Sequence, residues 1–195
     1  MSHNSIEFVQ ETDFPYGNTV HFTVNSDKEY TLKIRVPYWC SNFGAKVNGC
    51  EYSNIDSDGW LEITKQWNKD NIEITFDMPV MAVKASSKVV ADANKIAVQR
   101  GPFVYCAEQI DNVIPLSQFR ISAKEIQNAS VTAEDCQLGT IPFITIETTA
   151  EYFAEKGLYT FNPQSEQRKA TLKMLPYYAW ANRGSNDMTV WLHQK

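Results

Sequence analysis

The chain has 195 residues, of which 43% are hydrophobic and 21% charged, as in an ordinary globular protein. Its net charge is −5, and an acidic surface repels phosphate backbones, so no nucleic-acid partner is expected. No apolar run approaches the roughly 20 residues of a membrane helix, so no membrane partner is expected either. The N-terminal residues do not resemble a signal peptide; if the chain is excised from a longer parent, the parent's address is lost, so a soluble parent in either the cytoplasm or the periplasm is expected.

In the first 80 residues, alternating patterns predict short β-strands. Apolar side chains occupy every second position in residues 20–24, 32–36 and 72–76. Asn48-Gly49 and Asp58-Gly59 favour tight turns, because these residues tolerate positive φ. About six strands are predicted here, forming a first β-sandwich domain over residues 5–82.

The remaining residues, 83–195, are predicted to form a second β-sandwich after a polar junction near residues 85–88. Residues 96–99, 103–106, 142–147, 170–174 and 188–192 have strand patterns, and residues 111–140 are expected to hold long loops and short strands. Residues 150–156 could form one or two helical turns ended by Gly157. The predicted fold is therefore all-β, with two tandem antiparallel, jelly-roll-like sandwiches.

Residues that carry catalytic or metal chemistry are few. The four cysteines, at positions 40, 50, 106 and 136, lack the two-residue spacing of a zinc or redox motif, and free thiols are expected. A pairing of Cys40 with Cys50 across a hairpin remains open. Glu62, Glu73 and Asp77 lie at outward strand positions, where acids usually solvate the surface. No catalytic, cofactor-binding or metal-binding residue is therefore predicted.

The aromatic residues allow two interpretations. The five tryptophans and many other rings could pack the cores, as in most small β-domains, or could stack on sugars. The segment Pro176–Gly184 combines several rings with Arg183. It could line a ligand groove or interface, or it could be a loop that clamps the last strands together. Arg183 could pair with a buried carboxylate or contact a partner.

Several short motifs follow one another in a fixed order along the chain. They are Ile34–Trp39, Val47–Gly49, Gly59–Leu61, Trp67–Asp70 and Met78–Pro79, then Ala97–Glu108 with Asp111–Asn112, and finally Pro176–Gly184 with Met188–Leu192. In this order they resemble the middle and C-terminal sandwich domains of glycoside hydrolase family 127. The resemblance covers about residues 8–192.

This resemblance implies a role without catalysis. Members of the family are retaining β-L-arabinofuranosidases, whose (α/α)₆ barrel precedes the sandwiches and carries an adjacent cysteine pair and a glutamate on zinc, with another glutamate as acid/base. No two cysteines are adjacent in this chain, so no catalytic residue is carried over. The leading hypothesis is an accessory region that braces a catalytic barrel of the same parent polypeptide. The alternatives are a carbohydrate-binding module with an aromatic sugar-stacking site and a free-standing enzyme.

A bracing region must offer its barrel a partly apolar surface. Rings that carry a polar group suit interfaces better than cores, and the candidate interface residues are Tyr38, Trp39, Tyr177, Tyr178, Trp180 and Arg183. Weak self-association is expected where the barrel is absent. The alternative is that Trp39, Tyr178 and Trp180 are buried in their own sandwiches.

Overall fold

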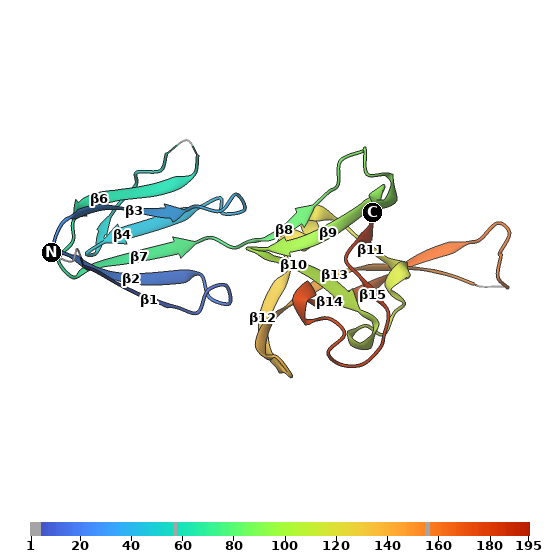
Figure 1. The fold of residues 1–195 in the computed structure, drawn as a ribbon. Helices are drawn as coiled ribbons and strands as arrows, with labels where there is room; N and C mark the ends of the chain where they lie inside the picture. Colours follow the sequence, from blue (N-terminus) through green and yellow to red (C-terminus); the bar gives the residue numbers. More distant parts are fainter. Residues whose placement is uncertain (1–4, 57, 155–156) are drawn as a thin grey trace. The chain divides into compact units, whose positions relative to one another are not determined.

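The computed structural model describes residues 5–56, 58–154 and 157–195, and β-strands dominate it (Figure 1). Within these residues the single α-helix, α1 (Ala123–Gln127), has five residues, and the other helical segments are 3₁₀ turns of three. None of the described helices is long and apolar enough to cross a membrane. The all-β prediction is confirmed.

The chain divides into two compact units between Met78 and Pro79. We call residues 1–78 unit 1 and residues 79–195 unit 2, and each is described by itself.

Unit 1 consists of two sheet layers of unequal width. Its strands are β1 (Ile6–Thr12), β2 (Thr19–Ser26), β3 (Glu29–Arg35), β4 (Phe43–Val47), β5 (Cys50–Glu51), β6 (Trp60–Gln66) and β7 (Asp70–Phe76). One antiparallel sheet has five strands in the order β1-β2-β7-β4-β5, and the other pairs β3 with β6. Between the layers lie Leu61, Ile63, Trp67, Ile72 and Ile74, each at most 2% exposed.

The predicted turn at Asn48-Gly49 is confirmed. Both residues have positive φ, 51° and 81°, and Val47 pairs with Cys50 across the turn. The estimate of six strands was one too few, because β1 lacks a clear pattern. All seven of its side chains are exposed in this structure, and Val9 directly after Phe8 interrupts the alternation of apolar and polar residues.

Unit 2 contains more strands and several short helical segments. Its elements are β8 (Val80–Val83), η1 (Val90–Asp92), β9 (Lys95–Arg100), β10 (Phe103–Glu108), η2 (Gln109–Asp111), η3 (Leu116–Gln118), β11 (Phe119–Ile121), α1, β12 (Ser130–Cys136), β13 (Gly139–Phe153), β14 (Ser165–Pro176), η4 (Tyr177–Ala179), β15 (Met188–Thr189) and β16 (Leu192–Gln194).

Six of these strands form a closed ring of hydrogen-bonded neighbours. The order β10-β14-β13-β11-β16-β9 returns to its start through the β9–β10 pairing. Every pairing in unit 2 among the described residues is antiparallel except β11 with β16.

Side chains alternate between two apolar clusters in unit 2. The larger one includes the fully buried Tyr105, Phe119 and Ile144. Cys106, which follows Tyr105, points to the opposite face of β10 and joins Phe143 and Leu175 in the smaller one. This smaller cluster underlies the segment that leads from β14 to β15.

Two local expectations for unit 2 were wrong. Residues 150–153, considered for helical turns, belong to β13, where Ala150 pairs with Arg168 of β14. Residues 155–156 lie outside the described residues. The strand expected over residues 188–192 is two short strands, because β15 pairs with β10 whereas β16 pairs with β9 and β11.

Candidate functional site

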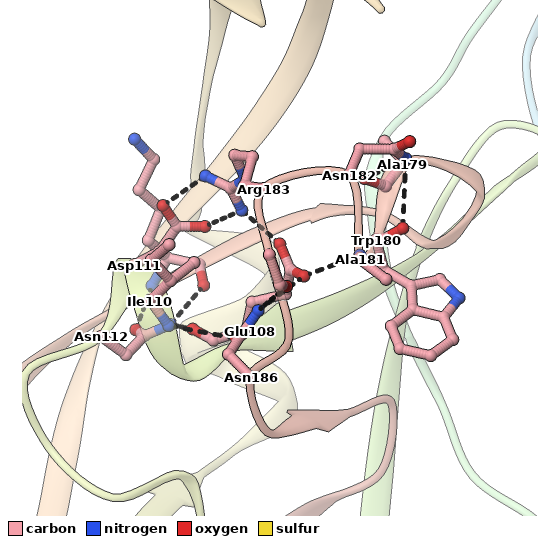
Figure 2. Close-up of polar contacts among 12 residues, drawn as sticks. Glu108, Ile110, Asp111, Asn112, Ala179, Trp180, Ala181, Asn182, Arg183 and Asn186 are labelled. Atoms are coloured by element: carbon pink, nitrogen blue, oxygen red, sulfur yellow. Dashed lines mark hydrogen bonds and ion pairs between the residues drawn. The ribbon is translucent and has the colours of Figure 1, made fainter. Parts of the chain in front are cut away.

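The central feature of the site is Arg183, which joins two carboxylates at the end of β10 (Figure 2). Its Nη1 donates to Asp111 Oδ1 over 2.7 Å, and its Nη2 donates to Asp111 Oδ2 over 2.5 Å. The same Nη2 donates to Glu108 Oε2. We call Glu108, Asp111 and Arg183 the clamp, because β10 and η2 supply the acids and the loop after η4 supplies the guanidinium.

The carboxyl group of Glu108 is buried, with a side chain that is 0% exposed. Its other oxygen, Oε1, accepts from the backbone N–H of Ala181 over 2.9 Å and from Asn186 Nδ2 over 3.3 Å. Buried carboxylates are stable only when they are paired and hydrogen-bonded, and both conditions are met here. The acid therefore fixes the segment from Ala181 to Asn186 against the end of β10.

Amide side chains hold the acid-bearing turn η2 in place. Asn112 donates to the carbonyls of Glu108 and Lys173 over 2.8 and 3.0 Å, and its Oδ1 accepts from the Lys173 N–H over 2.9 Å. Asn186 Oδ1 accepts from the N–H of Ile110 over 3.2 Å. The position of Asp111 is thus set by backbone contacts on both sides of it.

Electrostatics favour the charged form of the arginine. The hydrogen bond to Asp111, together with that to Glu108, raises the pKa of Arg183 above its ordinary value, although burial opposes this. Both carboxylates are engaged by this cation, so they are poorly placed to act as a general base.

The thiol beside the clamp is equally unsuited to catalysis. Burial, with a smaller effect of the Glu108 charge, raises the pKa of Cys106 to about 12. Since the thiolate is the nucleophilic form, Cys106 is an inert core residue at neutral pH. Across residues 5–56, 58–154 and 157–195, no three His, Cys, Asp or Glu side chains gather as metal ligands would.

Just before the clamp arginine in the chain, three rings are exposed to solvent. Tyr177, Tyr178 and Trp180 are 45%, 45% and 39% exposed, and they lie on η4 or directly after it. Tyr177 and Trp180 stack with centroids 6.2 Å apart and planes 29° apart. Figure 2 shows the Trp180 indole directed away from the clamp. We call residues 177–187 the aromatic loop.

The other candidate residues lie in unit 1 and differ in their burial. Tyr38 is 88% exposed, whereas Trp39 is 7% exposed. The centroid of the Trp39 ring lies 6.0 Å from that of Phe76 and 6.3 Å from that of Phe14, so Trp39 packs in the core of unit 1. Of the expected interface residues, the structure brings together Tyr177, Tyr178, Trp180 and Arg183.

The acids of the clamp were not predicted from the sequence. A buried carboxylate was one of two partners expected for Arg183, but no particular acid was identified. Glu108 and Asp111 precede Arg183 by more than 70 residues, and only the fold places them beside it. One feature of the sequence could have indicated Glu108: it is an acid that directly follows the apolar run 103–107, where a buried strand ends in a turn.

Comparison with known proteins gives two family matches in tandem. Residues 1–79 match the Beta-L-arabinofuranosidase, GH127 middle domain, and residues 80–193 match the Glycoside hydrolase family 127 C-terminal domain. Fold and matches together define the class, the β-sandwich regions that accompany glycoside hydrolases. The chain belongs to glycoside hydrolase family 127.

Individual relatives agree with this assignment. The chain is 32% identical over 193 residues to the non-reducing end β-L-arabinofuranosidase of Bifidobacterium longum subsp. longum, covering 93% of this chain and 29% of the relative. A solved GH127 β-L-arabinofuranosidase from Geobacillus stearothermophilus T6 is 33% identical, with a TM-score of 0.86 over 98% of this chain and 31% of that one. A solved GH127 β-arabinofuranosidase is 31% identical, with the same TM-score over 98% and 32%. The chain thus spans about a third of its relatives' length.

Proposed function

We propose that this chain is a non-catalytic accessory region that braces the catalytic barrel of a β-L-arabinofuranosidase-like glycoside hydrolase. The observation that carries the proposal is the aromatic loop, whose rings are exposed while its backbone is fixed from below by Glu108 and Arg183. A rigid display of amphipathic rings costs little conformational entropy on docking. Interfaces between domains bury roughly 600–1,500 Å², and such a loop supplies the centre of one.

The residues proposed to contact the barrel are Tyr38 in unit 1 and, separately, Tyr177, Tyr178 and Trp180 in unit 2. Trp39 and Arg183 are not among these residues: Trp39 packs in the core of unit 1, and Arg183 holds the aromatic loop. The full polypeptide, its sugar substrate and the barrel contact are parts of the proposal, supported by the length and names of the relatives.

A chimera tests this bracing role. In the Bifidobacterium relative, the matched region is replaced by this chain, with and without the double substitution Tyr177→Ala/Trp180→Ala. We expect the double variant to lower the melting temperature of the catalytic domain by several degrees, since its rings would no longer be buried against the barrel. The control is Tyr159→Ala, which removes a ring that is 86% exposed elsewhere in unit 2.

The chimera is monitored by calorimetry and by hydrolysis of an aryl β-L-arabinofuranoside. Equal melting temperatures for the double variant and the control would exclude the aromatic loop from the barrel interface. The isolated chain is expected to hydrolyse this substrate no faster than buffer, and turnover above that background would contradict the non-catalytic assignment.

A second candidate function is carbohydrate binding by the chain itself. The observation that favours it is the exposed Tyr177–Trp180 pair, because rings at a surface can stack on sugar faces. The planes of the pair differ by 29° and the rings lie at a 3₁₀ turn, so they do not form a flat platform on a sheet face. Saturable binding of arabinose-containing oligosaccharides that Trp180→Ala abolishes would establish this function.

The same exposed rings lead us to propose weak self-association of the isolated chain. Sedimentation velocity over a range of concentrations measures it directly. A strict monomer at high concentration, with the rings free, would contradict this part of the proposal.

A further inference from the structure

The two layers of unit 1 do not cover each other. Five strands face two, and one edge of the two-stranded layer is already occupied. Beside β6, Ile55 forms a bridge with Leu61, and the N–H of Glu62 donates to the carbonyl of Asn54 over 3.1 Å. Among the described residues, β3 pairs with β6 alone, so its other edge is open.

The wider sheet has apolar side chains on its core face that nothing described covers. Phe8 and Ile6 of β1 stand opposite Val24 and Ser26 of β2, which are 1% and 9% exposed, so all four share the core face. Phe8 and Ile6 are nevertheless 45% and 51% exposed. The Phe8 ring lies 5.2 Å from the half-buried Phe22. We call Ile6, Phe8 and Phe22 the uncovered floor.

The burial of β3 and β6 shows the same asymmetry. Leu32 pairs with Ile63, and Ile34 pairs with Leu61, so each pair lies on one face. The β6 members are 2% and 0% exposed, whereas Leu32 and Ile34 are only half-buried. Leu32 and Ile34 are less buried than their partners of similar size because no strand lies beside β3 on its other side.

The open edge of β3 also has backbone groups available for pairing. Just beyond the ladder, the N–H of Val36 donates to the carbonyl of Gly59 over 2.8 Å. Backbone direction alternates along an antiparallel strand, so the even-numbered residues of β3 face β6 and Thr31, Lys33 and Arg35 face the open edge. A further strand could continue the sheet there without breaking any existing pair.

We propose that a β-strand from the part of the longer polypeptide that precedes this domain pairs with the open edge of β3 and covers the uncovered floor. The occupant is inferred from length and position: this chain covers only 29% of the Bifidobacterium relative, and residues 1–79 match a domain described as the middle one. One strand occupies about 4.8 Å beside β3, and it brings its side chains above β1 and β2.

The chemistry of the incoming strand follows from the two faces it would have. Its inner face meets Phe8, Ile6 and Leu32, so alternate residues are apolar. Its outer face continues that of β3, where Glu29, Lys33 and Arg35 are exposed, so the residues between are polar or charged. The strand completes the sandwich as part of a folded polypeptide and is not a transient ligand.

A tethered segment tests the proposal. The 20 or so residues that precede the matched region in the Bifidobacterium relative are fused before Met1 of this chain, and a scrambled segment serves as the control; the tether gives roughly millimolar effective concentration. Amide hydrogen exchange is then followed by NMR at Thr31, Lys33 and Arg35. We expect exchange to slow at least about tenfold with the native segment and not with the scrambled one.

Two substitutions on β1 form a matched pair for this experiment. Phe8 and Val9 are both 45% exposed on one strand but lie on opposite faces. Phe8→Ser should remove most of the added protection, and Val9→Ser should leave it within about twofold, because only Phe8 lies under the incoming strand. Circular dichroism confirms that both variants remain folded.

The backbone edge is tested separately at Thr31. Thr31→Pro removes an N–H that faces the open edge and should abolish the added protection at Lys33. Thr31→Ala removes only the hydroxyl that contacts Thr64 over 2.8 Å, and protection should persist.

Unchanged exchange with the native segment would overturn the proposal, and so would equal effects of Phe8→Ser and Val9→Ser. Protection that appears without any fused segment and grows with protein concentration would assign the edge to a second copy of the chain instead. The experiment contains no barrel and leaves the aromatic loop untouched, so its outcome is independent of the chimera that tests the bracing role.

Discussion

Removing the guanidinium of the clamp should destabilise unit 2 strongly. Arg183→Met leaves Glu108, whose side chain is 0% exposed, with two uncharged donors, Ala181 N–H and Asn186 Nδ2. Removing one partner of a buried ion pair costs about 3–5 kcal/mol. Because the Arg183 side chain is 24% exposed, water can enter the vacated space, and we expect the lower end, about 3 kcal/mol.

The loss is measured by urea denaturation, with tryptophan fluorescence and amide exchange reporting on each unit. Arg168→Met is the matched control, because its ion pair with Glu166 joins side chains that are 59% and 65% exposed. Such a pair contributes at most about 1 kcal/mol. The residues of unit 1 provide an internal reference, since their exchange should not change.

A double substitution identifies the cause of the loss. In Glu108→Met/Arg183→Met the fully buried carboxylate is gone and only Asp111, whose side chain is 11% exposed, still lacks its cation, so we expect part of the lost stability to return. Equal stabilities of Arg183→Met and Arg168→Met, within about 0.5 kcal/mol, would refute the assignment of the clamp as the support of the aromatic loop.

Three further predictions concern other parts of the chain. Because burial raises the pKa of Cys106 to about 12, this thiol should react with a disulfide reagent only after unfolding, whereas the exposed Cys50 should react at once. Fast labelling of Cys106 in the native protein would contradict its placement in the core. Although burial opposes it, hydrogen bonds from Lys65, the Asn68 N–H and Asn48 lower the pKa of Asp70 below its ordinary 3.8, so its contribution to stability is present above about pH 4 and is lost as the pH falls through the lowered pKa. The stability gap between the wild type and Asp70→Asn should therefore shrink in acid, and a gap that widened there would refute this. Gly49→Ala places a side chain at φ +81° and should cost about 1 kcal/mol by thermal denaturation, whereas Gly44→Ala, whose new Cβ would lie 3.7 Å from Thr75 Cβ, should be nearly neutral.

The parts of the fold that could be predicted are those where one face of a strand is buried. In β7, Ile72 and Ile74 are 1% and 0% exposed between polar neighbours, so burial itself produces the alternation seen in the sequence. In β1, by contrast, the apolar Val9 lies on the outer face next to Phe8 on the core face, so no clear alternation marks the strand. Residues 150–153 contain good helix formers, but their pairing with β14 overrides local propensity.

From the sequence, the rings and the arginine of the site could be predicted, but not the burial of each ring or the acids that bind the arginine. Adjacent residues after β3 illustrate the limit: Tyr38 and Trp39 are both aromatic, yet one is 88% exposed and the other 7%. No periodicity extends into this loop, so nothing local distinguishes them. The pairing of Arg183 with Glu108 depends on β15 lying beside β10, which is a property of the whole of unit 2.

The closed ring of unit 2 also determines when that unit can fold. β9 lies between β10 and β16, and Ile96 pairs with Leu192, so the ring closes only after almost all of unit 2 has been synthesised. Loop-closure entropy must be lost before such distant pairings form, which makes this topology slow to fold. During translation the apolar β9 therefore lacks one of its final neighbours, and the ring of unit 2 cannot close until β16 has been synthesised.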